Sequence, residues 1–428
     1  MKLFFYRVLT FLLKPFVRFV LFLRRRKGLE TKDKKRMVER FGKTFVHRPK
    51  GAKVVWFNAA SVGESNSIVP VIDRILSDYP NAFVVVTTSS LTAADNMAKK
   101  LKGKNAVHQF LPMDRRAYVD RFFDYWKPDL GFFVDSDFWP NLILSAREHN
   151  VPLILLNGRI SDKSFAKWKK NISFARTLMH AFKFGFGKSE EDKRRLSVMG
   201  MEFVECVGNL KYGVPAMTCD KTELESLQKK IGRRPVFVVS STHPGEEEIC
   251  LSALLIIRKT FSNVLMILAP RHPVRGQEIY DMVEANGLHA ALRSRGDDIT
   301  SLVNVYIADT MGELGLFYTL SNISFVGGSL IPWGGHNPME PARLHNVVLS
   351  GKNVMNFQET YDLLKAENAV VMLNNEKDFA SKVKSFFEND DVAKEYMARA
   401  FYVAEREAAV LDRVMDKIKP ELDERIGK

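Results

Sequence analysis

The chain has few cysteines and lacks the short motifs of several common enzyme classes. Only three of its 428 residues are cysteine, at positions 206, 219 and 250, and no CxxC pair occurs. This sparse, odd-numbered set predicts a reducing compartment without structural disulfides. The sequence contains no GxxxxGK[ST] loop, GxGxxG motif, HExxH motif or zinc-type Cys/His spacing. These absences disfavour P-loop NTPases and zinc enzymes, and they weaken a dehydrogenase interpretation.

Patterns of nucleic-acid recognition are missing as well, although the chain is strongly basic. The formal net charge is +14 and the isoelectric point is about 9.5. Such a charge suits nucleic acid, an anionic membrane surface or an acidic substrate. No RNA-recognition sheet, zinc finger or helix-turn-helix pattern occurs, and a dense basic cluster lies within residues 1–37. We therefore expect an anionic membrane surface as a partner and no nucleic acid.

The amino-terminal segment, residues 1–23, is rich in phenylalanine and leucine. It lacks the uninterrupted apolar core and the small-residue cleavage site of a secretory signal peptide. Lys14, Arg18 and Pro15 lie near its middle, which disfavours a membrane-spanning helix. We expect an interfacial helix whose basic residues, with those at 24–27, meet anionic headgroups. A helix packed on the body of the protein and a single span are the alternatives.

The remaining chain is too long for one ordinary core, and its composition is that of a folded globular protein. From about residue 51, short β-branched or aromatic runs alternate with helical stretches. The first series of predicted strands covers residues 54–58, 82–88, 130–134, 153–157, 183–188 and 203–207. The second covers residues 236–240, 264–269, 304–308, 323–326, 347–350 and 369–373.

This alternation predicts an α/β protein with two doubly wound, Rossmann-like domains whose parallel sheets are covered on both faces. The pattern breaks at residues 208–215, GNLKYGVP. We therefore expect a membrane-associating segment at 1–44, a first domain at 45–212 and a second at 213–428, which includes a charged helical tail from residue 392. The carboxyl ends of both sets of strands should open toward a cleft between the domains.

The most informative motif is GGSLIPWGGHNPMEP at residues 327–341, which follows the apolar run 322–326. It precedes a helical-looking segment at 342–348. A glycine-rich turn that leads from a strand into a helix is typical of phosphate-binding sites in open α/β sheets. The alternative is a purely structural tight turn.

Within this motif, Asn337 is a predicted N-cap, Pro338 fits the first helical position, and Glu340 could close a capping-box-like arrangement. Other turns follow predicted strands in the same way. They are residues 60–64 (ASVGE), 240–248 (SSTHPGEEE), 269–273 (APRHP) and 309–315 (DTMGELG).

Together with WPN at 139–141, NGR at 157–159, GNLK at 208–211 and NF at 356–357, these turns resemble the Kdo (3-deoxy-D-manno-octulosonic acid) transferase family. The resemblance covers nearly the whole chain. It implies a membrane-associated GT-B glycosyltransferase of lipopolysaccharide biosynthesis, on the cytoplasmic face of a Gram-negative inner membrane. The implied reaction transfers Kdo from CMP-Kdo to a lipid A precursor, an acylated disaccharide bisphosphate, with inversion and without a cofactor or an essential metal.

The resemblance also implies catalytic residues. Glu64 would be the general base that takes the proton of the acceptor hydroxyl, and Lys211 would stabilise charge in the transition state. Asp135 is retained as a site residue, although the chain has DSDFWPN where the family has ETELWPN, so the carboxylates of Asp135 and Asp137 are each one methylene shorter. The bland alternatives are a helix-capping carboxylate for Glu64 and a solvated linker lysine for Lys211.

On the donor side, the resemblance implies contacts with the CMP moiety from three turns. These residues are Pro270 and Arg271, then Met311, Gly312 and Glu313, then Asn337, Pro338, Met339 and Glu340. Arg271 would bind phosphate and Glu340 the ribose hydroxyls. His243, His272 and His336 lie in turns at the expected ligand edge, and each could bind the ligand or make a structural hydrogen bond.

Two rival functions follow from the same features. A nucleotide-sugar epimerase shares the fold class but needs neither an amino-terminal membrane segment nor a lipid acceptor. A non-catalytic membrane-surface scaffold would use the basic patch alone, so its function would not depend on Glu64.

Overall fold

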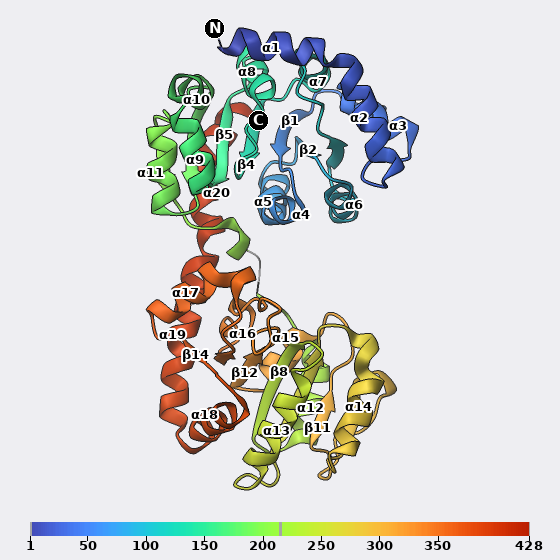
Figure 1. The fold of residues 1–428 in the computed structure, drawn as a ribbon, viewed down its shortest axis with the longest axis vertical. Helices are drawn as coiled ribbons and strands as arrows, with labels where there is room; N and C mark the ends of the chain where they lie inside the picture. The colour runs from blue at the N-terminus through green and yellow to red at the C-terminus, as the bar shows by residue number, and fades with distance from the viewer. Residues whose placement is uncertain (1, 214–215, 428) are drawn as a thin grey trace. The chain divides into compact units, whose positions relative to one another are not determined.

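The computed structural model describes residues 2–213 and 216–427, and the chain divides into two compact units. Unit 1 comprises Met1–Val214 and Glu407–Lys428, and unit 2 comprises Pro215–Arg406. Each unit contains one seven-stranded sheet in which every pairing is parallel, flanked by helices (Figure 1). The prediction of two doubly wound α/β domains is confirmed, and the division falls inside the predicted boundary segment.

The strand order in unit 1 is β3-β2-β1-β4-β5-β6-β7. The strands are β1 (Lys53–Asn58), β2 (Ala82–Thr88), β3 (Ala106–Phe110), β4 (Leu130–Val134), β5 (Leu153–Gly158), β6 (Phe182–Gly187) and β7 (Val204–Cys206). The helices between them are α4 (Val62–Ser67), α5 (Val69–Asp78), α6 (Leu91–Lys100), α7 (Arg116–Trp126), α8 (Pro140–Glu148), α9 (Asp162–Lys169), α10 (Ile172–Met179) and α11 (Glu190–Val198). The short helix η2 (Leu210–Tyr212) follows β7. The sequence patterns missed β3, an edge strand that carries the polar residues His108 and Gln109.

The strand order in unit 2 is β10-β11-β9-β8-β12-β13-β14. The strands are β8 (Val236–Thr242), β9 (Leu265–Pro270), β10 (Ala290–Leu292), β11 (Val305–Ile307), β12 (Ile323–Val326), β13 (Val347–Ser350) and β14 (Val370–Met372). The helices are α12 (Lys221–Ile231), α13 (Glu247–Arg258), α14 (Gly276–Ala285), α15 (Leu314–Thr319), α16 (Met339–Ala342), α17 (Gln358–Ala366), α18 (Glu376–Glu388) and α19 (Asp390–Ala408). The three-residue edge strand β10 was not predicted, because so short a run carries no clear period.

Each sheet is buried on both faces. In β1, Trp56 belongs to the apolar cluster on one face and Phe57 to the cluster on the other, since successive strand residues point in opposite directions. Phe237 and Val238 divide in the same way in β8. This double burial explains why the central strands are continuously apolar rather than alternating.

The carboxyl-terminal tail corrects one domain assignment. Helix α20 (Val410–Arg425) belongs to unit 1, not to the second domain as predicted (Figure 1). It contacts β4 and α5. Its apolar stripe, which includes Val410, Val414 and Ile418, is part of the cluster that holds Phe57. The helical period predicts such a stripe, but it does not say which sheet the stripe covers.

The amino-terminal helices also belong to unit 1. They are α1 (Lys2–Leu12), α2 (Lys14–Arg26) and α3 (Lys34–Met37), followed by the short helix η1 (Val38–Phe41). Arg40 of η1 donates hydrogen bonds to the Ser89 carbonyl at 2.8 Å and to the Leu111 carbonyl at 3.3 Å, so residues 1–44 do not stand apart as a separate segment. In the described residues no helix combines the length and the apolar character that crossing a bilayer requires.

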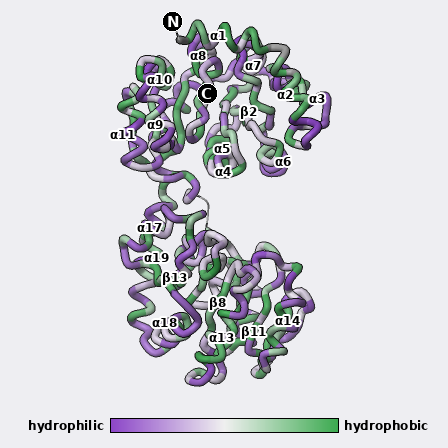
Figure 2. The backbone as a smooth tube through the Cα atoms, viewed as in Figure 1, coloured by the Kyte–Doolittle hydropathy of each residue, from purple (hydrophilic) through white to green (hydrophobic). Residues whose placement is uncertain are grey.

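Apolar side chains nevertheless remain exposed along α1 and α2, where Figure 2 shows a high content of apolar residues. Phe4 is 68% exposed and Phe11 is 62% exposed. A run of large exposed apolar side chains is unusual on a protein surface and marks a contact surface.

Candidate active site

The three predicted catalytic residues come together at the carboxyl edge of the sheet in unit 1. Glu64 lies on α4 directly after β1, Asp135 follows β4, and Lys211 lies on η2. The Lys211 side chain passes over Gly63, whose added Cβ would lie 3.7 Å from Nζ. The charges of Glu64 and Lys211 both act on the carboxyl group of Asp135. The turns therefore converge as the parallel topology predicts.

The Glu64 carboxylate forms a capping-box-like arrangement at the start of α4. Its Oε2 accepts a hydrogen bond from the Ala60 N–H at 2.7 Å, and its Oε1 accepts one from the Ser61 hydroxyl at 2.8 Å. The Ser61 hydroxyl in turn accepts the Glu64 N–H at 3.3 Å. The structural alternative for Glu64, a helix-capping carboxylate, is thus observed. Each carboxylate oxygen still has a second lone pair, so the same contacts would also orient a base.

Asp135 has a backbone φ of +63°, a left-handed conformation that costs energy in a residue other than glycine. Its N–H is held by the Leu156 carbonyl at 3.1 Å. Burial, together with repulsion from Glu64, raises the pKa of Asp135, while the positive charges of Arg159 and Lys211 oppose the rise. A strained, partly buried acid next to a second acid and two cations is typical of a functional site.

Asp137 lies in the same group of acids as Glu64 and Asp135, although the sequence-based assignment did not retain it. Burial raises its pKa to about 6, with further repulsion from Glu64, Asp114 and Asp135, and the hydrogen bond from Trp139 opposes the rise. Trp139 donates that bond from Nε1 to Asp137 Oδ2 at 2.8 Å. The pattern DSDFWPN contained the signal, since two aspartates in alternate positions follow a buried strand.

The acidic turn is braced by residues that no local pattern connects to it. The Asp114 carboxylate accepts the N–H groups of Asn141 at 3.1 Å and Leu142 at 2.8 Å, so it caps α8. Tyr6 of α1 donates its hydroxyl hydrogen to Asp114 Oδ2 at 2.7 Å. Pro140 occupies the first position of α8, where its fixed φ suits the start of a helix and its missing N–H costs no hydrogen bond. The amino-terminal helix is therefore joined to the helix that directly follows the acidic turn.

In unit 2 the predicted donor-side turns surround the point where the strand order reverses. β8 lies between β9 and β12, and such a switch point is where open α/β sheets bind ligands. The turn after β8 carries His243 and the turn after β12 carries His336, and their Nε2 atoms lie 2.9 Å apart. The Trp333 ring lies 4.3 Å from the His243 ring. Burial and nearby positive charge lower the pKa of His243 to about 4 and also lower the pKa of His336. Both rings are therefore neutral near pH 7.

The helix that follows the glycine-rich turn is shorter than predicted. Helix α16 contains only four residues, and β13 follows at Val347, so the predicted helix at 342–348 is wrong. Pro338 is the N-cap, one position later than predicted, and Asn337 Oδ1 accepts the Met339 N–H at 3.1 Å. Asn337 also donates to Glu340 Oε1 at 3.2 Å.

Glu340 and Arg271 act on each other electrostatically within this site. Burial raises the pKa of Glu340, while the Asn337 hydrogen bond and the positive charge of Arg271 oppose the rise. Arg271 follows Pro270 at the end of β9, and its N–H donates to the Thr242 carbonyl at 3.0 Å. The structure therefore brings the turn after β9 and the turn at 337–340 to the same edge.

The turn at 311–313 is more exposed to solvent than the turn at 337–340. Met311 is 74% exposed, and Gly312 has a φ of +85° with open space where a Cβ would lie. Glu313 is engaged by Arg293, which donates to Oε1 at 2.6 Å and to Oε2 at 3.2 Å, and by Thr310. Its bonds to Arg293 hold the pKa of Glu313 below its usual range. The Glu313 carboxylate is therefore bonded within the protein, whereas the Met311 side chain is exposed.

Three amides of the glycine-rich turn already have a protein partner. The N–H groups of Gly328, Ser329 and Leu330 all donate to the Glu246 carboxylate, at 2.6, 2.9 and 2.9 Å. Buried polar atoms remain beside them. In the part of the chain that the structure describes, Thr242 Oγ1 and His243 Nδ1 have no hydrogen-bond partner.

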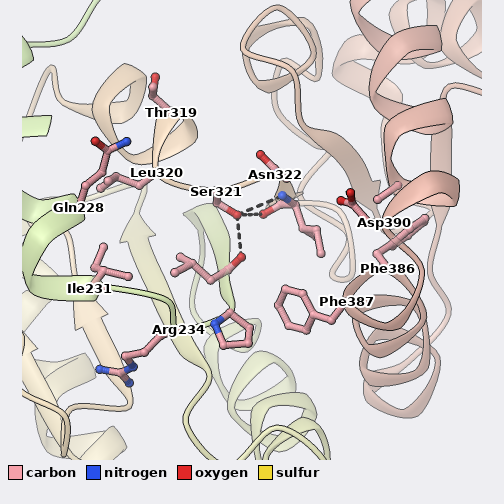
Figure 3. A pocket seen from close by; sticks show the side chains of 15 residues that line it. Gln228, Ile231, Arg234, Thr319, Leu320, Ser321, Asn322, Phe386, Phe387 and Asp390 are labelled. Atoms are coloured by element: carbon pink, nitrogen blue, oxygen red, sulfur yellow. Dashed lines mark hydrogen bonds between the residues drawn. The ribbon is translucent and has the colours of Figure 1, made fainter. Parts of the chain in front are cut away.

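A pocket of about 390 Å³ lies at the opposite, amino-terminal edge of the same sheet (Figure 3). Its polar lining is used by the protein backbone. Ser321 donates to the Val236 carbonyl at 2.8 Å, and Arg234 donates to the Asn263 carbonyl at 2.8 Å and the Thr300 carbonyl at 3.0 Å. We assign this pocket a structural role. Across residues 2–213 and 216–427, no group of three or more His, Cys, Asp and Glu side chains is arranged to hold a metal ion.

Comparisons with known proteins agree with this arrangement. Residues 35–214 match the family model of 3-deoxy-D-manno-octulosonic-acid transferase (kdotransferase). The 3-deoxy-D-manno-octulosonic acid transferase of Rickettsia bellii is 32% identical over 417 residues, which cover 96% of this chain and 98% of the relative. That of Haemophilus influenzae is 29% identical over 400 residues, which cover 92% of this chain and 93% of the relative.

Among solved structures, UDP-GlcNAc 2-epimerase from Neisseria meningitidis matches 86% of this chain and 100% of its own, with a TM-score of 0.58 and 13% identity. At that identity the likeness shows the fold alone, which is GT-B-like. The near-complete alignment with the Rickettsia enzyme decides the family, and two doubly wound units with clustered acids at one sheet edge fit it. The chain belongs to the 3-deoxy-D-manno-octulosonic acid (Kdo) transferase family of glycosyltransferases.

Proposed function

We propose that this protein transfers Kdo from CMP-Kdo to a hydroxyl group of a lipid A precursor, an acylated disaccharide bisphosphate, with inversion at the anomeric carbon. The observation that carries the proposal is the convergence of Glu64, Asp135 and Lys211 at one edge of unit 1, in a chain of this family. The acceptor oxygen would attack the anomeric carbon, and the bond to CMP would break.

In unit 1, Glu64 would accept the proton that the acceptor hydroxyl loses. The Ala60 N–H and the Ser61 hydroxyl hold both oxygens of its carboxylate, so little reorientation is needed before the proton moves. Lys211 would offset negative charge on the departing CMP or on the Kdo carboxylate. The positive charge of Lys211 would take the part that a metal plays in other transferases, so we propose a reaction without an essential metal.

In unit 2, Arg271 would bind the CMP phosphate, and the buried Glu340 would accept hydrogen bonds from the ribose hydroxyls. Pro270, residues 311–313 and residues 337–339 would form the walls of the nucleotide site.

The amino-terminal helices support a location at the cytoplasmic face of a Gram-negative inner membrane. Phe4, Phe5 and Phe11 of α1 are each at least 60% exposed, and basic residues follow at 24–27. Aromatic side chains at the acyl boundary and cations at anionic headgroups would hold α1 and α2 in the interface.

The direct test is to incubate the purified full-length protein with CMP-Kdo and a lipid A precursor, and to measure the product by mass spectrometry. We expect a mass increase of one or more Kdo residues and release of CMP. CMP binding without any Kdo-lipid product, from folded protein, would refute the transferase and leave the epimerase as the better interpretation.

The role of Glu64 separates catalysis from the scaffold alternative. Glu64→Gln should lower turnover by about 100-fold or more, the range for loss of a general base, while CMP affinity stays close to wild type. Ser61→Ala is the matched control, because it removes the cap hydroxyl but keeps the carboxylate. If both variants lose similar, small fractions of activity, Glu64 only caps the helix.

A further inference from the structure

Glu246 is a fully buried carboxylate bonded by backbone amides. It lies at the start of α13, in the turn that follows β8, and it is 0% exposed. Its Oε2 accepts the Gly328 N–H at 2.6 Å and the His243 N–H at 3.3 Å. Its Oε1 accepts the N–H groups of Ser329 and Leu330, both at 2.9 Å. One side chain thus ties the turn after β8 to the turn after β12.

The three successive amides at 328–330 form a concave nest of the kind that binds phosphate or other anions. Here the anion is supplied by the chain itself. The neighbouring acid, Glu247, is satisfied differently, because it pairs with Arg275 at 2.6 Å. The adjacent acids therefore have separate partners, and of the two only Glu246 reaches the glycine-rich turn.

The nest lies next to the rings of His243 and His336 in the proposed donor site. Gly328 has a φ of +67°, and a Cβ added there would lie 3.2 Å from the His336 ring and 3.4 Å from the His243 ring. The two imidazoles contact each other through Nε2, and the Trp333 ring lies against His243. A shift of the turn at 328–330 would therefore move both rings relative to Arg271 and Glu340.

We propose that Glu246 is an internal anion and a positioning residue of the donor site, which fills the amide nest and fixes the His243 and His336 turns for CMP-Kdo. The inference rests on the proposed function, since it assigns the donor to these turns. It implies that the donor phosphate binds in front of the nest, at side chains, and not to the amides of the glycine-rich turn.

The first experiment compares Glu246→Gln with wild type in CMP binding by calorimetry, in donor and acceptor KM, and in kcat. The substituted side chain keeps one acceptor oxygen but turns an NH₂ group toward amides that need an acceptor. We expect Kd for CMP and KM for CMP-Kdo to rise by about tenfold to 100-fold, the cost of a small misplacement of binding groups, with little change in acceptor KM. A purely structural role would lower the active fraction and leave both KM values unchanged, which would overturn the inference.

Glu247→Gln is the matched control. It removes the charge of an equally buried acid one residue away on the same helix, and it should lower thermal stability without raising donor KM. An equal rise in donor KM for both variants would show general damage to α13 and would refute a specific role for Glu246.

A second variant keeps the test decisive if Glu246→Gln folds poorly. Glu246→Ala leaves a space beside the three amides that formate could fill. We expect added formate to restore CMP binding saturably, whereas neutral formamide should not. Recovery of thermal stability without recovery of CMP binding would overturn the proposal. If wild type itself fails to bind CMP, the proposed function fails, which is a different result from a variant that binds as well as wild type.

Discussion

Asp137→Asn should change the stability of unit 1 in a pH-dependent way. The substitution keeps the size of the side chain and an acceptor for the Trp139 Nε1–H, but it removes a buried negative charge next to Glu64, Asp114 and Asp135. Burial raises the pKa of Asp137 from 3.8 to about 6. Because the folded-state pKa exceeds the unfolded-state pKa, wild-type stability falls as pH rises from about 4 to about 6, and the loss is complete above that range.

The magnitude follows from the two pKa values. The full penalty is about 3 kcal/mol, at about 1.36 kcal/mol per pKa unit. Roughly 1 kcal/mol of it is already present at pH 4.5, where the unfolded carboxyl is largely ionised, so about 2 kcal/mol should develop between pH 4.5 and pH 7.5. The stability of Asp137→Asn relative to wild type should therefore increase by about 2 kcal/mol over that interval. Relief of repulsion on Asp135 acts in the same direction.

Chemical denaturation at the two pH values, followed by tryptophan fluorescence, measures this difference. Four of the five tryptophans lie in unit 1, so the signal reports mainly on the relevant unit. Asp95→Asn, at an exposed position of α6, is the matched control and should have nearly the same small effect at both pH values. A stability difference between Asp137→Asn and wild type that does not change with pH would refute the assignment of a raised pKa to a buried Asp137.

Three further outcomes are expected. Tyr6→Phe removes the hydrogen bond to Asp114, so it should cost about 1 kcal/mol of unfolding free energy and raise the KM for the acceptor. Tyr125→Phe removes a remote surface hydrogen bond in the same unit and should leave the KM for the acceptor unchanged. Equal effects of the two variants on this KM would contradict a link between α1 and the acidic turn. Arg271→Lys keeps the charge but loses the planar fork, so CMP affinity measured by calorimetry should fall by about tenfold, and unchanged affinity would remove Arg271 from the phosphate site. Phe5→Ser should weaken binding to anionic vesicles in a flotation assay by about tenfold without changing the circular dichroism spectrum, and full binding would argue that α1 does not enter the interface.

Local sequence patterns predict the central strands of both sheets well. The predicted bounds of β2, β4, β12 and β13 coincide with the observed ones, because each is a continuous apolar run between polar turn residues. The edge strands β3 and β10 were missed, since β3 carries polar residues and β10 is only three residues long. The turns that carry Glu64, Asp135 and Arg271 were also located correctly, because parallel strands place all their carboxyl ends at one edge.

Local sequence patterns could not predict the contacts that define the site. Tyr6 and Asp114 are 108 residues apart, and Glu246 lies 82 residues from Gly328, so no periodicity or motif connects them. The glycine-rich turn illustrates the limit. Its composition predicts free amides for a phosphate, but a distant carboxylate occupies three of them.

The order of residues is therefore sufficient for the α/β class, the two domains, the family and the edge at which chemistry takes place, because these depend on local periodicity and on turn motifs. Long-range packing decides the rest. It places α20 on the sheet of unit 1, joins α1 to the acidic turn, and gives the amides of the glycine-rich turn to Glu246. An apolar stripe or a buried carboxylate can be satisfied by several partners, and only the folded chain selects one of them.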